Sequence, residues 1–182
     1  MSTNCPECGF PNPEGSKFCE KCGCVQDMGP NPQLAEEYAT RAFKHSQNGN
    51  LELALEEYSK SIKLHPNNSS YYFQRGCTYI GLSKRYYAIQ DFQTALKINP
   101  NHANSHSMIG NEYLIQGDYD RAFYHLTKAI DLKNQLKPFI LASTYMNRAI
   151  VFGLKGKKND YKKDLDSAKK IDPLIEERLN LR

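Results

Sequence analysis

Residues 103–136 read ANSHSMIGNEYLIQGDYDRAFYHLTKAIDLKNQL, and the same order of small and large side chains occurs 34 residues earlier and again 68 residues earlier. One column holds Ala54, Ala88 and Ala122, the next holds Tyr58, Phe92 and Leu126, and further columns hold Ser61, Ala95 and Ala129, then Pro66 and Pro100. A fourth copy starts five residues late, at Ala142, and places Tyr161, Leu165, Ala168 and Pro173 in these columns. A period of this length indicates stacked structural repeats.

Each copy contains two amphipathic stretches separated by a short break. The breaks fall at residues 48–50, 82–84, 117–118 and 155–157, and three of them contain a glycine. Apolar residues recur with helical spacing on both sides of each break, so every copy predicts two helices joined by a tight turn. Proline after the second helix ends it and turns the chain back. The sequence therefore predicts an all-α stack of helical hairpins.

These columns resemble the tetratricopeptide repeat family. The family places a bulky aromatic at the fourth position of each repeat, where this chain has Tyr38, Tyr72, His106 and Tyr145. The family has a small residue at the eighth position, and here it is Ala42, Gly76, Gly110 and Ala149. An aromatic is usual at the eleventh position, which holds His45, Tyr79, Tyr113 and Phe152. The resemblance implies a helical-hairpin solenoid over residues 34–182, with about four repeats near 35–68, 69–102, 103–136 and 142–175. Residues 174–182 are expected to form a capping helix. The fourth copy departs from the pattern at Tyr161 and in the insertion before it.

Two C-x2-C pairs, formed by Cys5, Cys8, Cys19 and Cys22, precede the repeats. Four thiolates in this spacing favour a tetrahedral Zn²⁺ site, with an iron site or a redox dithiol as alternatives. About 25 residues with three large apolar side chains cannot fold alone, so the metal would supply folding free energy. The segment resembles the short zinc ribbons of multidomain proteins. We expect a ribbon at residues 1–26, a linker at 27–33 and a structural role, because four thiolates leave no open position for catalysis.

The charge of the predicted ribbon argues against nucleic acid as its ligand. Residues 1–24 hold three glutamates against two lysines, and four thiolates on one Zn²⁺ add two negative charges. Phosphate binding requires the opposite sign. Cys24 is interpreted as a bystander thiol or an alternative ligand.

The family resemblance implies that the first helices line a concave groove that binds a peptide or partner segment. The residues predicted for this groove are Phe43, Phe73, Cys77, Ile80, Asn104, Asn111, Leu114, Met146 and Ile150. The set is mostly apolar and uncharged, so a helical or extended apolar segment is the expected guest. Two kinds of occupant remain open for the groove. One is an external partner, and the other is a segment of this chain, either the terminal helix or the ribbon.

One binding mode of the family, a basic clamp for the C-terminal carboxylates of chaperones, is not expected here. Its positions hold Ala39, Phe43, Gln74, Asn104 and Met108, none of which carries a positive charge.

Other function classes find less support in the sequence. No nucleophile–base pair, phosphate loop or paired carboxylates point to an enzyme, and His102 and His106 are interpreted as packed residues. No apolar run is long enough to span a membrane, and no signal peptide is evident, so a cytoplasmic protein is expected. The fourth copy carries seven lysines between residues 155 and 170. A basic face binding nucleic acid is therefore kept as the alternative to a non-enzymatic protein-interaction or adaptor module.

Overall fold

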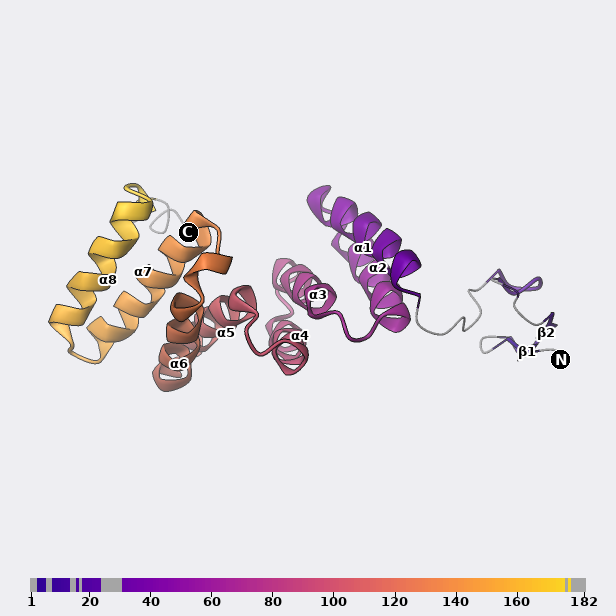
Figure 1. Cartoon of the computed structure of the whole chain (residues 1–182), viewed down its shortest axis with the longest axis horizontal. Coiled ribbons are helices and arrows are strands. Elements are labelled where there is room, and N and C mark those ends of the chain that lie inside the picture. Colours follow the sequence, from indigo (N-terminus) through magenta and orange to yellow (C-terminus); the bar gives the residue numbers. More distant parts are fainter. Residues whose placement is uncertain are drawn as a thin grey trace.

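The computed structural model describes residues 3–5, 8–13, 16, 18–23, 31–175 and 177. In the described part of the chain, eight α-helices follow a short two-stranded ribbon. The helices form four antiparallel hairpins that stack in chain order (Figure 1). The helices are α1 (Pro32–Gln47), α2 (Leu51–Leu64), α3 (Ser69–Gly81), α4 (Arg85–Ile98), α5 (Ala103–Ile115), α6 (Tyr119–Asp131), α7 (Pro138–Leu154) and α8 (Lys158–Ile171). The predicted all-α fold is confirmed, and each hairpin corresponds to one copy of the repeat.

The turn inside each hairpin uses one residue with a left-handed backbone conformation. Gly49, Gly117 and Gly156 have φ values of 79°, 78° and 73°. Ser83 occupies the same position in the second hairpin, with φ of 58°. Glycine adopts this conformation without a steric penalty, whereas a serine pays one. The second turn is therefore closed by the packing of its two helices rather than by a permissive residue.

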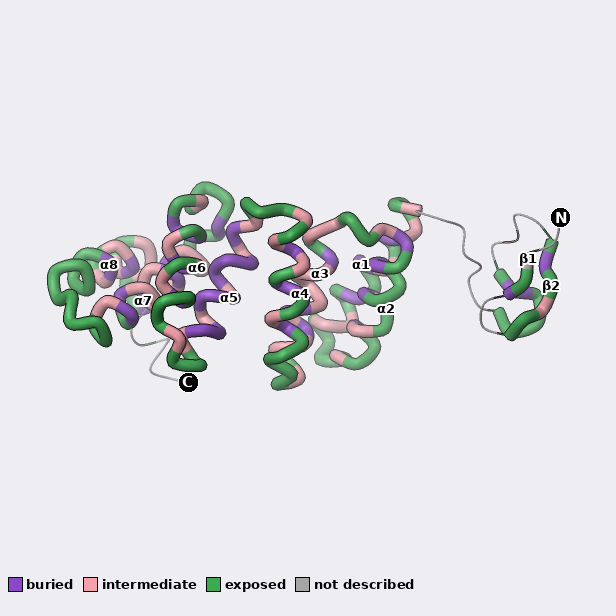
Figure 2. The backbone as a smooth tube through the Cα atoms, turned by 90° about the horizontal axis from the view of Figure 1, so that it is seen from below, coloured by how far each residue is buried: buried purple, intermediate pink, exposed green. Residues whose placement is uncertain are grey.

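The repeat columns form the interior of the stack (Figure 2). Ala54, Ala88 and Ala122 are completely buried, and so are Phe92 and Leu126 in the next column. Second helices pack on the first helix of the following copy, so the apolar clusters include side chains from neighbouring hairpins. A single hairpin could not bury these faces, which explains why several copies are required.

The residue at the eighth position of each repeat lies on the first helix and faces a large residue of the second helix. The sizes of these two residues set how closely the two helices of a hairpin approach each other. A Cβ atom added to Gly76 would lie 2.5 Å from the ring of Phe92. A Cβ added to Gly110 would lie 2.7 Å from Leu126 Cγ and 3.0 Å from the Leu126 backbone nitrogen. Both contacts are shorter than carbon–carbon packing allows. The second and third hairpins therefore need glycine where the first and fourth use alanine.

We expect Gly110→Ala to destabilise the stack by about 1–3 kcal/mol, because the backbone of Leu126 cannot move aside and the core becomes overpacked. Helix propensity alone would favour alanine by about 1 kcal/mol. Gly153→Ala is the matched control, because its Cβ would lie 3.3 Å from Tyr161, a partly exposed side chain that can shift. Urea unfolding should show a loss for the first variant and none for the second. Equal effects would contradict this packing argument.

The insertion before the fourth copy takes a defined structure. A 3₁₀ helix, η1 (Lys133–Gln135), follows α6, and α7 begins four residues before the predicted start of the copy. Ile140 and Leu141 from this extra turn pack with Leu136 against Ala103 and Ala129. The extra residues thus extend the core between the third and fourth copies. Tyr161, the other departure from the repeat pattern, lies against Gly153, which leaves room for its ring.

The N-terminal segment contains β1 (Thr3–Asn4) and β2 (Pro11–Asn12). They pair antiparallel, with Thr3 opposite Asn12 and Asn4 opposite Pro11. Two two-residue strands provide almost no apolar burial, so another source of stability is needed.

Most of the predicted capping helix lies outside the described residues. Ile175, however, is completely buried against Ala142, Met146 and Ala168, so the segment after α8 returns to the fourth hairpin. Cys24 and most of the predicted linker also lie outside the described residues. None of the described helices has the length and apolar character needed to cross a bilayer.

Candidate functional site

The four predicted cysteine ligands converge on one point. Their Sγ atoms all lie within 4.8 Å of one another. The sulfurs of Cys5 and Cys22 are 3.6 Å apart, as are those of Cys8 and Cys19. Four sulfurs at about 2.3 Å from a tetrahedral Zn²⁺ would be about 3.8 Å from each other. These four cysteines can hold a metal ion, with two ligands from each loop.

The two loops have the same backbone geometry. Gly9 and Gly23, which follow the second cysteine of each pair, both have φ of 71°. Their N–H groups donate to the carbonyls of Cys5 and Cys19 at 2.9 and 2.8 Å. Each turn brings the two sulfurs of its pair to the same side, and the Cys8 N–H points at Cys5 Sγ at 3.4 Å. Donors around the sulfurs are typical of structural thiolate sites.

Asn12 links the two cysteine loops, which the sequence reasoning did not anticipate. Its side chain is buried, donates to the Phe10 carbonyl at 2.9 Å and accepts from the Glu20 N–H at 3.0 Å. Phe10 follows the first pair, and Glu20 lies inside the second. Asn12 therefore holds the two halves of the site in register. The only signal in the sequence was a polar residue next to prolines, which is also common in ordinary turns.

The cysteines of the cluster differ in how strongly their surroundings favour the thiolate. The backbone of Phe10 lowers the pKa of Cys8, but burial and the three neighbouring thiols outweigh this and raise it to about 12. Burial raises the pKa of Cys19. Hydrogen bonds from the Cys22 and Lys21 backbone and from Asn12 lower it by more, so the pKa of Cys19 lies below its ordinary value. Four negative charges at these distances repel strongly without a metal between them. The donor set fits a soft divalent cation.

The predicted groove residues lie on the face made by the first helices, α1, α3, α5 and α7, which we call the first-helix face. Phe43 and Ile150 are exposed, at 52% and 39% of their full area. Cys77, Ile80, Asn104, Asn111 and Leu114 are half-buried. Phe73 is also half-buried, with ring centroids 5.7 Å from Phe92 and 5.1 Å from His102. The exposed apolar side chains thus stand at the two ends of the set.

The third and fourth copies make direct contacts within this face. Ser107 and Thr144 hydroxyls are 2.8 Å apart, and the Asn147 amide donates to Asn111 Oδ1 at 3.1 Å. Met146 is 7% exposed and packs with Ile175 from the C-terminal segment. Part of the predicted set is therefore used for packing between α5, α7 and the C-terminal segment. The side-chain oxygen of Asn111, one of the predicted groove residues, is already used by Asn147.

The positions of the chaperone-type clamp hold no positive charge in the structure. Ala39 is buried, and Gln74 accepts a hydrogen bond from the Tyr58 hydroxyl at 2.7 Å. Ala39 therefore presents no polar group, and the Gln74 side-chain oxygen is used within the stack.

An arginine–carboxylate column within the hairpins was missed by the sequence reasoning. Arg41 pairs with Glu57, Arg75 with Asp91 and Arg148 with Asp164, each sixteen residues apart. Each arginine also lies over the aromatic ring of the fourth position. The third copy instead has Ile109 and His125, and His125 Nδ1 lies 3.0 Å from His106 Nδ1. Burial lowers the pKa of His125 to about 4, so both rings are packed in neutral form, as predicted for His106.

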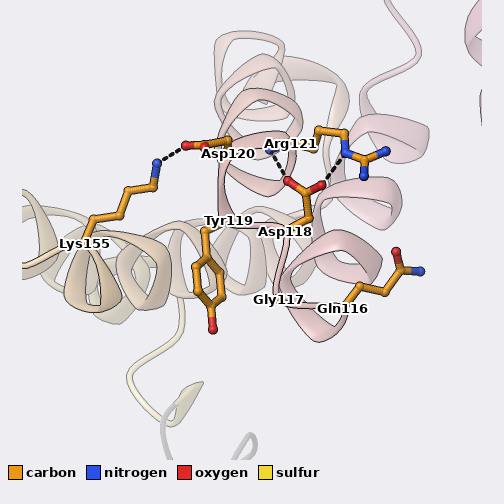
Figure 3. A pocket seen from close by; sticks show the side chains of 7 residues that line it. All are labelled: Gln116, Gly117, Asp118, Tyr119, Asp120, Arg121 and Lys155. Atoms are coloured by element: carbon orange, nitrogen blue, oxygen red, sulfur yellow. Dashed lines mark hydrogen bonds and ion pairs between the residues drawn. The ribbon is translucent and has the colours of Figure 1, made fainter.

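A polar pocket of about 480 Å³ opens at the turn between α5 and α6 (Figure 3). Asp118 caps α6 by accepting from the Arg121 N–H at 3.0 Å and also pairs with the Arg121 guanidinium. Asp120 pairs with Lys155 from the turn between α7 and α8. The pocket is thus lined by a helix cap and an ion pair that joins two hairpins. It contains none of the predicted site residues.

Comparisons with known proteins agree with this architecture. Tetratricopeptide repeat profiles match residues 69–102 and 92–124. Small glutamine-rich tetratricopeptide repeat-containing protein 2 of Saccharomyces cerevisiae is 26% identical over 108 residues. That match covers 59% of this chain but 31% of the yeast protein, so the chain spans about a third of the relative's length.

Solved structures share the fold at low identity. The crystal structure of MamA superposes with a TM-score of 0.66 at 20% identity, covering 81% of this chain and 83% of MamA. BtubC from P. vanneervenii superposes with a TM-score of 0.67 at 20% identity over 80% of this chain and 66% of its own. The first tetratricopeptide domain of Spaghetti, bound to an HSP90 peptide, has a TM-score of 0.57 at 15% identity, over 79% of this chain and 96% of that domain. Tetratricopeptide repeats are thus matched within residues 69–124, and the four stacked hairpins share the fold of solved tetratricopeptide structures, with a four-cysteine cluster before them.

Proposed function

We propose that this protein is a non-enzymatic interaction module that binds an uncharged, mainly apolar protein segment across the first-helix face. The tetratricopeptide fold supports a protein–protein interaction role. The observation that carries the finer proposal is the pair of exposed apolar side chains, Phe43 and Ile150, on a face whose clamp positions hold no lysine or arginine. An exposed apolar side chain gains free energy when a partner covers it.

The geometry favours a guest with one apolar side and few charges. Ile115 and Leu154, at the C-terminal ends of α5 and α7, are also exposed and extend the apolar surface toward one edge. Asn147 is half-buried on α7, and its side-chain oxygen can accept a hydrogen bond from a guest's backbone. The Spaghetti domain binds the peptide SRMEEVD, which ends in acidic residues. The clamp positions of this chain hold no basic side chain that would neutralise such an end.

We further propose that the cysteine cluster holds a structural Zn²⁺ through Cys5, Cys8, Cys19 and Cys22. Bound zinc would neutralise two of the four thiolate charges and supply the folding free energy that two short strands cannot. Because the four sulfurs fill the tetrahedron, the ribbon serves as a second contact surface rather than as a catalytic centre. A cytoplasmic location, where thiols stay reduced, is consistent with this role and remains part of the proposal.

The peptide proposal is tested by fluorescence anisotropy with two probes: an amphipathic helical peptide with one leucine-rich face, and the acidic peptide SRMEEVD. We expect the first to bind and the second to show no saturable binding. Phe43→Glu combined with Ile150→Glu should weaken the first probe by about tenfold or more, since each substitution removes apolar contact. Both side chains are exposed, so the melting temperature should change little.

Tyr86→Glu is the matched control, because Tyr86 is an exposed aromatic on α4, away from the first helices. It should bind the apolar probe like the native protein. Phe73 is unsuitable for this test, because it packs on Phe92 and a charge there would disturb the core. Equal loss in the control and the test variant, or tight binding of SRMEEVD, would rule out the proposed groove.

A further inference from the structure

Helix α8 presents a strongly basic outer face, which we call the α8 lysine face and define as Lys158, Lys162, Lys163, Lys169 and Lys170. With 100° between successive residues, these five positions fall on one side of the helix. Asp164 and Ala168, on the other side, are buried against α7. Asp166 is the only acidic residue among the lysines on this side. The face therefore carries a large excess of positive charge on the last helix of the stack.

Neighbouring carboxylates do little to offset the charge of Lys158, Lys162, Lys163 and Lys170. Asp164 is held by Arg148 in a two-pronged pair, with both contacts under 3 Å, so it is already neutralised. Asp120 pairs with Lys155, outside the face (Figure 3). Among the described residues, no carboxylate lies within ion-pair distance of Lys158, Lys162, Lys163 or Lys170. Like charges four residues apart on a helix, such as Lys158 and Lys162, destabilise it slightly. An acidic partner that neutralised them would therefore bind favourably here.

The same chain contains a unit of the opposite charge. The ribbon region, residues 1–24, has Glu7, Glu14 and Glu20 against Lys17 and Lys21. When the cysteine cluster holds Zn²⁺, its four thiolates add a net charge of two negatives, so the loaded ribbon is acidic. Glu20 and the aromatic ring of Phe18 are exposed on it. It thus offers both negative charge and an apolar contact.

For the ribbon of one chain to reach its own α8, the linker would have to be almost fully extended along the whole stack. The eight peptide steps from Gly23 to Asn31 span at most about 28 Å when fully extended. The α1 and α8 helices are the two ends of the stack. The distance from α1 to α8 through α3, α5 and α7 is about 36 Å, at about 9 Å between the axes of neighbouring helices. A second copy is not subject to this limit.

We propose that the α8 lysine face binds the metal-loaded ribbon of a second copy, so that chains associate head to tail. The contact joins two different surfaces of the protein. Each assembly therefore has one free ribbon at one end and one free lysine face at the other, and further copies can add to it. The inference uses the metal-loaded ribbon of the proposed function but is independent of the first-helix face.

Sedimentation velocity of the zinc-loaded, full-length protein tests the proposal over a range of concentrations at low and high salt. The native protein should form dimers and larger species at low salt, and these should dissociate as salt screens the charges. Lys162→Glu/Lys163→Glu removes the receiving face, and Glu14→Lys/Glu20→Lys reverses the charge of the ribbon region. Each variant alone should be monomeric. An equimolar mixture should associate again, because it combines the native ribbon of one variant with the native lysine face of the other.

Lys63→Glu/Lys97→Glu is the matched control, since it makes the same charge change on exposed positions of α2 and α4. It should associate like the native protein. A native protein that stays monomeric at all concentrations would overturn the proposal, as would assembly that survives both charge reversals. Retention of single-stranded poly(U) RNA by the monomeric native protein, lost on Lys162→Glu/Lys163→Glu, would instead assign the face to nucleic acid. None of these outcomes bears on the peptide-binding proposal, which is tested separately with the Phe43→Glu/Ile150→Glu variant.

Discussion

Replacing Cys8 with serine is expected to reduce the bound zinc from about one ion per chain to almost none, and to unfold the ribbon. The remaining three thiolates leave the tetrahedron open, and metal binding is the main source of folding free energy for this segment, of about 10 kcal/mol or more. The strands β1 and β2, of two residues each, are not expected to remain paired once the proposed metal is lost. Elemental analysis after gel filtration measures the metal, and amide NMR spectra report the loss of ribbon structure.

The repeat stack should be unaffected in this variant, because the described helices have their own core. Its thermal unfolding should therefore match that of the native protein. Cys77→Ser is the matched control: Cys77 is a half-buried thiol on α3, far from the cluster in sequence, and burial raises its pKa to about 12. A second control, Cys24→Ser, tests whether the neighbouring cysteine acts as an alternative ligand. Full zinc content in Cys8→Ser would refute the four-cysteine site.

Replacing Arg148 with methionine is expected to destabilise the stack by about 3–5 kcal/mol. Asp164, its partner, has a side chain only 4% exposed and receives both guanidinium contacts. Methionine preserves much of the volume but leaves a buried carboxylate with no positive charge beside it. Urea unfolding at neutral pH measures the loss.

The repeat itself supplies the control. Arg41 and Glu57 occupy the same columns in the first hairpin, but the Arg41 side chain is 50% exposed. Arg41→Met should cost about 1 kcal/mol or less, because water replaces the lost partner. The double variant Arg148→Met/Asp164→Leu should recover most of the lost stability, since no charge is left buried. Equal costs for Arg41→Met and Arg148→Met would show that burial does not govern this column.

Two features of the chain could be predicted from sequence because their signals are local or periodic. A 34-residue period needs only the order of small and large side chains, and it located the hairpins and the cores around Phe92 and Leu126. The cysteine pairs needed only their spacing, since two C-x2-C loops place four sulfurs around one cation. Periodicity could not reveal Asn12, because its partners Phe10 and Glu20 become neighbours only after the two loops meet.

The first-helix face shows the same division. Register placed Phe43, Phe73 and Met146 on one side of their helices, and this depends on helix geometry alone. Which of them remains exposed depends on neighbours contributed by other segments. Phe92 and His102 cover part of Phe73, and Ile175 returns to Met146, while Phe43 stays open.

The pattern of residues along this chain was enough to specify repeated helical hairpins and a four-thiolate cluster, because hydrophobic period and ligand spacing act over short distances. Only the tertiary structure decided how closely Gly110 and Leu126 approach, which carboxylates are buried beside an arginine, and which apolar side chains are left for a partner. Burial is a property of packed surfaces, so it is settled only when the segments that cover a residue are in place.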